Sequence, residues 1–124
     1  MGTSVKSFHD LIVWQKSMEL VTAIYQVSQK FPKEEIFGLT SQIRRAAVSI
    51  PSNIAEGRGK SSVGEFQQFL YHARGSLAEV ETQLLIAINL GYLTKEEVPH
   101  IMELIARVGR LLHGLLSAIK KTKK

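Results

Sequence analysis

The sequence predicts an all-α protein, an antiparallel up-and-down four-helix bundle. Apolar residues recur at spacings of three and four along nearly the whole chain of 124 residues, and no segment shows the alternation of a half-buried strand. Turn signals divide this pattern into four long segments with short connections, which favour antiparallel neighbours. We therefore expect a single domain over residues 1–124, with helices over residues 10–30, 36–57, 63–90 and 95–120.

The first predicted helix, residues 10–30, is amphipathic and ends at a proline. Its apolar face carries Leu11, Trp14, Met18, Val21 and Tyr25. Phe31 precedes Pro32, and a residue before proline disfavours the helical conformation. The helix should therefore end near Phe31.

The second predicted helix, residues 36–57, contains Pro51 within its apolar stripe. The proline ring removes one backbone donor and clashes with the carbonyl four residues earlier, so we expect a kink at Pro51. Because the stripe continues in phase past the proline, we predict one bent helix. Gly57 and Gly59 should end it.

The third and fourth predicted helices each begin at a capping box, Ser62–Glu65 and Thr94–Glu97. Gly91 is expected to end the third helix in a left-handed conformation. Pro99 lies near the first turn of the fourth segment and could delay the start of regular helix. Residues 121–124 are predicted to form a flexible basic tail.

Two of these helices are more apolar than one bundle core requires. Off the main stripe of residues 95–120 lie Met102, Leu104, Leu111, Leu116 and Ala118, and beside the core face of residues 10–30 lie Ile12, Val13 and Leu20. Either the buried stripe is broad, or a second apolar face packs on another subunit. We favour a homo-oligomer, because a helix that is apolar on two sides needs two partners.

Composition and spacing argue against most kinds of enzyme. The chain has no Cys, which excludes disulfides, thiolate metal sites and a cysteine nucleophile. Glu65, His72 and Glu79 follow one another at intervals of seven residues. This interval is about 10.5 Å of helical rise, too far for two of them to hold one metal. No glycine-rich phosphate loop or serine triad is recognisable. We therefore expect a non-enzymatic protein with no catalytic residue, metal or cofactor.

No segment points to a membrane. No apolar run approaches the roughly 20 residues that span a bilayer. The first ten residues also lack the apolar core of a signal peptide. We expect a cytoplasmic protein without a membrane partner.

One catalytic alternative is the pair Arg107 and His113, which have five residues between them. This spacing loosely resembles the Arg…His motif of the all-helical ribonucleases found in toxin–antitoxin systems. Such an enzyme would use the histidine as general base and the arginine on the phosphate. The competing interpretation is an ion pair between Glu103 and Arg107, with His113 at a flank of the helix.

The positions of the basic residues, and not the total charge of the chain, indicate a nucleic-acid surface. The net charge is +5, but without the four lysines at the C-terminus (Lys120, Lys121, Lys123 and Lys124) 12 basic residues face 11 acidic ones, or +1. Arginine matches phosphate oxygens bidentately, and aromatic residues are sparse near these positions, so we expect contacts to phosphates with weak sequence specificity. The candidate nucleic-acid-binding residues are Arg44, Arg45, Arg58, Lys60, Arg74, Arg107, Arg110, Lys120 and Lys121.

A different class of function would use the same arginines. In a protein-interaction scaffold or adapter, they would form ion pairs within or between subunits and would not bind nucleic acid directly. Their acidic partners would be Glu34, Glu56, Glu79 or Glu81.

Several phrases in a fixed order resemble one bacterial family. They are Phe8–Gln15, Phe31-Pro32, Gly38–Gly57, Glu65-Phe66, Gly75–Glu79 and Leu90–Leu93, and the match covers about residues 8–120. The longest phrase contains Gln-Ile-Arg-Arg-Ala-Ala-Val-Ser-Ile-Pro-Ser-Asn-Ile-Ala-Glu-Gly. The sequence thus resembles the four-helix-bundle proteins encoded in intervening sequences of 23S ribosomal RNA genes, a family that includes the accessory variability determinant of diversity-generating retroelements.

The resemblance implies properties that periodicity does not show. Members form homopentameric rings or barrels of such bundles with a basic outer surface, and no catalytic residues are known among them. The retroelement members bind nucleic acid and a reverse transcriptase through that surface, whereas the function of most members is unproven. For this chain it implies a homopentamer that binds an RNA or DNA backbone, with RNA expected first. A reverse transcriptase or another protein would be a further partner. The matching basic positions are Arg44, Arg45 and Arg74.

Overall fold

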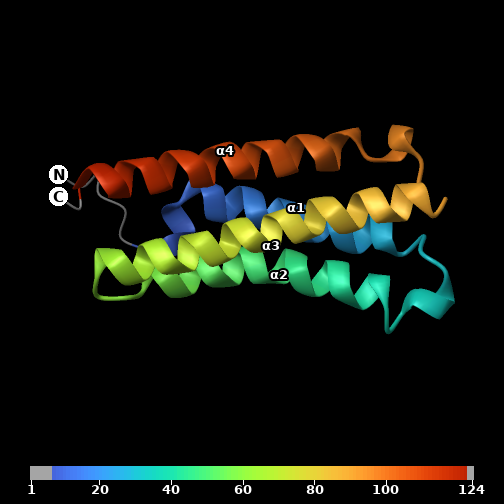
Figure 1. Ribbon diagram of the computed structural model, residues 1–124, viewed down its shortest axis with the longest axis horizontal. Coiled ribbons are helices and arrows are strands. Elements are labelled where there is room, and N and C mark those ends of the chain that lie inside the picture. Colours follow the sequence, from blue (N-terminus) through green and yellow to red (C-terminus); the bar gives the residue numbers. More distant parts are fainter. Residues whose placement is uncertain (1–6, 123–124) are drawn as a thin grey trace.

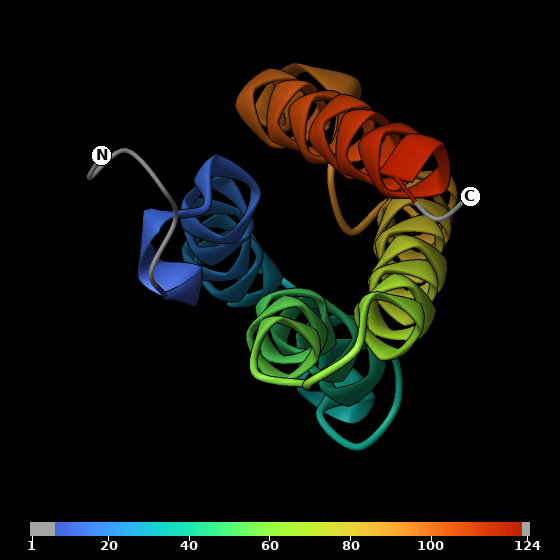
Figure 2. The same ribbon diagram turned by 90° about the vertical axis from the view of Figure 1, so that its left-hand side faces the viewer.

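The computed structural model describes residues 7–122, and within them it confirms an all-α, up-and-down four-helix bundle. The helices are α1 (Ile12–Ser28), α2 (Leu39–Arg58), α3 (Val63–Asn89) and α4 (Pro99–Thr122). Short 3₁₀ turns precede α1, α2 and α4, namely η1 (Phe8–Asp10), η2 (Lys33–Glu35) and η3 (Lys95–Glu97). The helices lie side by side and antiparallel (Figure 1), and an end view shows them in chain order around one core (Figure 2).

The four helices lie close to the predicted ranges, and the largest differences are at N-terminal ends. α2 begins at Leu39, after turn residues 36–38, and η3 occupies the predicted first turn of α4. Thr94 N–H donates to Glu97 Oε1 at 2.8 Å, so this capping contact forms on η3. The α-helix begins only at Pro99. Proline suits the first helical position, while it disfavours helix at Val98 before it.

The predicted basic tail begins inside a helix. α4 continues through Lys121 and Thr122. The other two tail residues, Lys123 and Lys124, lie outside the described residues.

α2 is one helix through Pro51, as predicted. Ser52 Oγ donates to the Val48 carbonyl and Asn53 Nδ2 to the Ser49 carbonyl, both at 2.8 Å. These side chains add hydrogen bonds to the backbone in the turn where the proline supplies no donor.

Of the two glycines predicted to end α2, Gly59 is its C-cap as predicted, whereas Gly57 lies inside the helix. The helix continues to Arg58, and Gly57 is buried within it. A Cβ atom at Gly57 would lie 2.6 Å from Phe69 Cβ and 3.1 Å from Phe66 Cδ1. The missing side chain therefore lets α2 and α3 approach each other closely beside their connection.

Both ends of α3 are capped at the predicted residues, but only half of the predicted capping box forms. Glu65 Oε1 accepts from Ser62 Oγ at 3.0 Å and not from the Ser62 N–H. Ser62 Oγ accepts from the N–H of Glu65 at 3.1 Å. At the other end Gly91 has a φ of 80°, and Tyr92 N–H donates to the Ala87 carbonyl at 2.9 Å. This is the glycine C-cap that satisfies the last carbonyls of a helix.

The apolar core runs the length of the bundle and includes residues that we expected on a second face. Val13, Leu20, Leu104 and Leu116 are at most 5% exposed. At these four positions the expectation of a second face is wrong, because α1 and α4 each pack on two neighbouring helices and their buried stripes are correspondingly broad. Ile12, however, is 52% exposed and lines a hollow between α1 and α4 with Leu111 and Ala118, so part of the expected second face lies at the surface.

Two serines that enter the core from α1 donate to carbonyls of their own helix. Ser17 Oγ donates to the Trp14 carbonyl at 2.8 Å, and Ser28 Oγ to the Tyr25 carbonyl at 3.3 Å. None of the helices in residues 7–122 is both long enough and apolar enough to cross a bilayer.

Candidate nucleic-acid interface

The nine predicted nucleic-acid-binding residues are spread over several faces of the bundle. They lie on α2, on the α2–α3 connection, on α3 and on α4. Their environments differ in whether the cationic group already has a partner within the chain. This difference separates structural residues from residues that remain available to a ligand.

Arg44 is a structural residue. Its Nε donates to Ser28 Oγ at 2.8 Å, and its Nη2 donates to the Tyr25 carbonyl at 3.2 Å. Its guanidinium also lies over the Tyr25 ring, 4.6 Å from the centroid. The last carbonyls of a helix lack backbone partners, so Arg44 on α2 ties down the final turn of α1.

Three of the predicted cations lie on aromatic rings, which corrects the expectation that aromatic residues are sparse around them. Besides Arg44, Lys60 lies over Phe69 at 5.4 Å and Arg74 over Tyr71 at 4.8 Å. The pair Tyr71 and Arg74 follows the i,i+3 spacing of a helix and was visible in the sequence. The other two pairs join different elements and depend on the fold.

Four exposed arginines have no such hydrogen bonds or ion pairs. They are Arg45, Arg74, Arg107 and Arg110. Within residues 7–122, no side chain forms an ion pair or a hydrogen bond with any of them. The alternative pair between Glu103 and Arg107 is therefore not formed, and Glu34, Glu56, Glu79 and Glu81 likewise lack ion pairs to described residues.

Arg107 and Arg110 line a charged groove between α1 and α4. The α1–α4 groove is formed by Lys16, Glu19, His100, Glu103, Leu104, Arg107 and Arg110. Lys16 is paired with Glu19 at 3.0 Å, which leaves the two arginines as its unpaired cations. Sequence reasoning missed Lys16 and His100, because only the packing of α1 on α4 brings them beside the arginines.

The remaining candidates gather at one end of the bundle. The α2–α3 connection and the C-terminal end of α4 lie together at that end (Figure 1). They carry Arg58, Lys60, Lys120 and Lys121. Cations at the C-terminal ends of α2 and α4 also complement the helix dipoles, so this cluster has a structural reason of its own.

Arg107 and His113 do not share a face. Both lie on α4, and six helical positions correspond to about 120° around the helix axis and about 9 Å along it. Only Arg107 lines the α1–α4 groove. The two side chains therefore do not converge on one phosphate, as the ribonuclease alternative requires.

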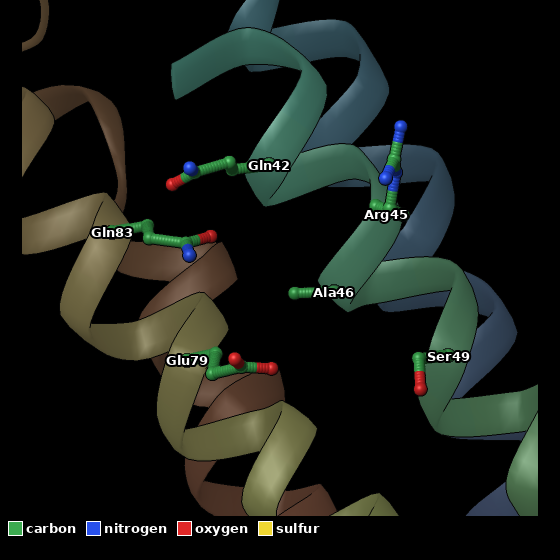
Figure 3. A pocket seen from close by; sticks show the side chains of 6 residues that line it. All are labelled: Gln42, Arg45, Ala46, Ser49, Glu79 and Gln83. Carbon is green, nitrogen blue, oxygen red and sulfur yellow. The ribbon is translucent and has the colours of Figure 1, made fainter. Parts of the chain in front are cut away.

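A second polar groove lies between α2 and α3 (Figure 3). The α2–α3 groove has a volume of about 440 Å³ and is lined by Gln42, Arg45, Ala46, Ser49, Glu79 and Gln83. Elsewhere in residues 7–122, as here, no group of three or more acidic or histidine side chains is placed to hold a metal ion.

The chain is similar to known proteins over most of its length. The family described as 23S rRNA-intervening sequence protein matches residues 9–114. A solved structure of a protein with unknown function, from the S23 ribosomal protein family of Bacteroides thetaiotaomicron, has a TM-score of 0.75 and 27% sequence identity. The alignment covers 85% of this chain and 98% of that one. No curated protein matches the sequence.

Proposed function

The chain belongs to the 23S rRNA-intervening sequence protein family, and from this premise we propose that it is a non-enzymatic homo-oligomer that binds RNA through the phosphate backbone. The family and the similar solved structure have no described activity that would suggest an enzyme. RNA is the first ligand to test, because the family is described by its relation to 23S rRNA.

The observation that carries the proposal is the set of exposed arginines without intramolecular hydrogen bonds or ion pairs. Arg45, Arg74, Arg107 and Arg110 are solvent-exposed, and no described residue forms an ion pair or hydrogen bond with them. A guanidinium that is not already paired keeps its planar donors for a phosphate. In the α1–α4 groove, Arg107 and Arg110 lie one helical turn apart and present two such groups together.

A salt titration tests this role. Fluorescence anisotropy would follow a labelled single-stranded RNA of about 12 nucleotides, with salt raised from about 50 to 200 mM. If contacts to phosphate dominate, the logarithm of the association constant should fall linearly with the logarithm of the salt concentration. The double variant Arg107→Gln with Arg110→Gln should make the slope shallower by about 1.4, since each lost contact to a single strand removes about 0.7.

A charge-matched variant serves as the control. Lys33→Gln with Lys95→Gln removes the same charge from the turns η2 and η3. It should leave the slope nearly unchanged. An equal change in both double variants would show a general charge effect and contradict a role for the α1–α4 groove. No binding at the lowest salt would overturn the proposed function.

We assign the subunit contact to an exposed apolar groove between α1 and α2. The α1–α2 groove is lined by Trp14, Met18, Val21, Val48, Pro51, Ser52 and Ala55. Met18 and Val48 are 43% and 40% exposed, which is high for large apolar side chains in one groove. A second copy of the chain would cover them, and a pentamer is the assembly that we expect.

A protein-interaction role is the second candidate, and Phe37 favours it. Phe37 is 95% exposed, and Ile36 beside it is 58% exposed. These two residues form an apolar projection between η2 and α2. A scaffold or adapter would use such a projection for a protein partner. Binding of a protein partner that Phe37→Ser abolishes, without any RNA binding, would select this candidate.

A further inference from the structure

The α2–α3 groove has polar walls and a small residue at its floor. Gln42, Ala46 and Ser49 follow one another along α2, and Glu79 and Gln83 face them from α3. Figure 3 shows Gln42 and Gln83 extending toward each other and Glu79 extending into the space between the helices. Ala46 contributes only a methyl group, so the hollow between the two rows stays open.

Hydrogen-bonding groups in this groove lack partners. Gln83 Oε1 is shielded from solvent and has no hydrogen-bond partner in the structure. The Glu79 carboxylate forms no ion pair with a described residue. Ser49, by contrast, is occupied, since its Oγ accepts from Asn53 Nδ2 at 2.8 Å and lies 2.9 Å from Ser76 Oγ. A shielded acceptor without a donor costs free energy, so a ligand that brings donors would be favoured once the Gln83 amide turns its oxygen into the groove.

The donors and acceptors that line the groove limit which ligands can bind there. Glu79 and Gln83 offer acceptors, the Gln42 amide offers donors as well, and Arg45 at the rim offers an unpaired cation. The Watson–Crick edge of guanine carries two adjacent N–H donors, which a carboxylate accepts in parallel, and a carbonyl acceptor next to them. Uracil has one such donor, and adenine and cytosine have only an amino group. The phosphate of the same nucleotide would suit Arg45.

We propose that the α2–α3 groove receives one unpaired guanine base of a single-stranded RNA. Glu79 and Gln83 accept from the Watson–Crick edge, Gln42 donates to the guanine carbonyl, and Arg45 contacts the phosphate. This inference rests on the proposed RNA binding and adds a base preference to it. Unstacked bases read on this edge are the usual basis of sequence-specific RNA recognition.

The experiment compares RNAs that differ by one base. Anisotropy titrations at constant salt would use oligouridines of about 12 nucleotides with a single central G, A, C or U. The RNA with one G should bind about tenfold more tightly than the all-U RNA, as for a bidentate base contact. Glu79→Gln should remove this ratio. Ala46→Met, which fills the floor of the groove, should remove it as well and leave binding of the all-U RNA unchanged.

The control for Glu79→Gln is Glu81→Gln, which removes the same charge two positions along α3. Glu81 is exposed and does not line the groove. It should preserve the preference for G, although both variants strengthen binding to every RNA slightly by lowering negative charge. Equal ratios in the two variants would contradict the role of Glu79.

A measurement without RNA gives a second readout. In an NMR titration with guanosine monophosphate, the side-chain amide signals of Gln42 and Gln83 should shift, and uridine monophosphate should leave them in place. Equal binding of all four RNAs, with no shift by the guanine nucleotide, would overturn the inference and leave the proposed function intact. Absence of all RNA binding would instead overturn the proposed function, and this inference with it. Competition by an arginine-rich peptide that Glu79→Gln abolishes, without a preference for G, would assign the groove to a basic protein and overturn the inference.

Discussion

The hydroxyl of Tyr92 donates a hydrogen bond of 2.7 Å to Glu35 Oε2, and this contact joins two connections that are 57 positions apart in the chain. Glu35 Oε1 accepts from the N–H of Leu39 at 2.9 Å, so one carboxylate caps α2 and holds the segment after α3. Nearby in the chain, Lys30 and Glu97 form an ion pair of 2.6 Å between the end of α1 and η3. Side chains thus link the connections at the end of the bundle that carries η2 and η3.

These contacts predict a loss of stability in acid. The Leu39 N–H and the Tyr92 hydroxyl lower the pKa of Glu35, and the Lys30 ammonium and Thr94 N–H lower the pKa of Glu97. A carboxyl whose pKa is lowered by folding stabilises the protein above its unfolded-state value of 4.5, and the contribution disappears as pH falls through the lowered value. Thermal unfolding from neutral pH to about pH 3 should show this decrease.

Tyr92→Phe tests the link between the two connections. The variant should unfold at a lower temperature than the wild type at neutral pH. This difference in unfolding temperature should shrink as the pH falls and Glu35 becomes protonated. Its difference should also shrink in strong base, because the hydrogen bond to Glu35 raises the pKa of Tyr92 above 10.0. Tyr71→Phe is the control, since the Tyr71 hydroxyl has no hydrogen bond within residues 7–122. A difference that stays constant with pH would contradict the role of this bond.

Gly57→Ala should destabilise the protein. The added methyl would lie 2.6 Å from Phe69 Cβ, so α2 and α3 would have to separate, at a cost of about 1–3 kcal/mol. Gly75→Ala is the matched substitution on α3, where a Cβ meets nothing within 4 Å. It should stabilise the protein by about 0.5–1 kcal/mol, because alanine favours helix. Denaturant titrations followed by circular dichroism measure both, and a neutral Gly57→Ala would disprove the close approach.

Substitutions of Arg44 and Arg45 should have different effects, the first on stability and the second on RNA binding. Arg44→Met should lower the free energy of unfolding by about 1–2 kcal/mol, because Ser28 Oγ and the Tyr25 carbonyl each lose the hydrogen bond from Arg44. Arg45→Met should change it by less than about 0.5 kcal/mol, as for an exposed residue without contacts. Arg45→Met should instead weaken RNA binding. Similar unfolding curves for the two variants would contradict the structural role of Arg44.

Charges in the α1–α2 groove should disrupt the assembly. Met18→Glu with Val48→Glu would place two carboxylates in an apolar contact between copies, where burying an unpaired charge is strongly unfavourable. Light scattering after size exclusion should show a pentamer for the wild type and a monomer for this double variant. Gln26→Glu with Gln29→Glu adds the same charge to α1 and the residue after it, away from the groove, and should leave the pentamer intact. A wild-type monomer would refute the assembly itself.

Much of the fold could be predicted because its signals are local. The spacing of Leu11, Trp14 and Met18 indicates a helix on its own, and Ser62 with Glu65 marks where α3 begins. One helix could be predicted through Pro51, since the apolar stripe continues beyond it. The start of α4 was less predictable, because the 3₁₀ turn η3 uses the same residue types as a first helical turn.

The candidate site could be predicted only in part. Charge and residue type identified Arg44 and Arg45 equally, yet Arg44 bonds to the end of α1 and Arg45 does not. These partners lie 16 and 19 positions away in the sequence. Periodicity says nothing about such pairs. The α2–α3 groove was likewise invisible, because Glu79 and Gln42 meet only across two helices.

Helical periodicity, capping residues and turn glycines are properties of a few neighbouring residues, and they were enough to predict the four helices and their order. The family resemblance came from sequence phrases in a fixed order. Contacts between distant residues depend instead on which faces of the helices meet and at what distance. Packing therefore decided which apolar residues are buried, that Gly57 serves the approach of α3, and which arginines have partners within the chain. Side-chain volume and close approach set those relations, and neither can be read from the spacing of residue types along one helix.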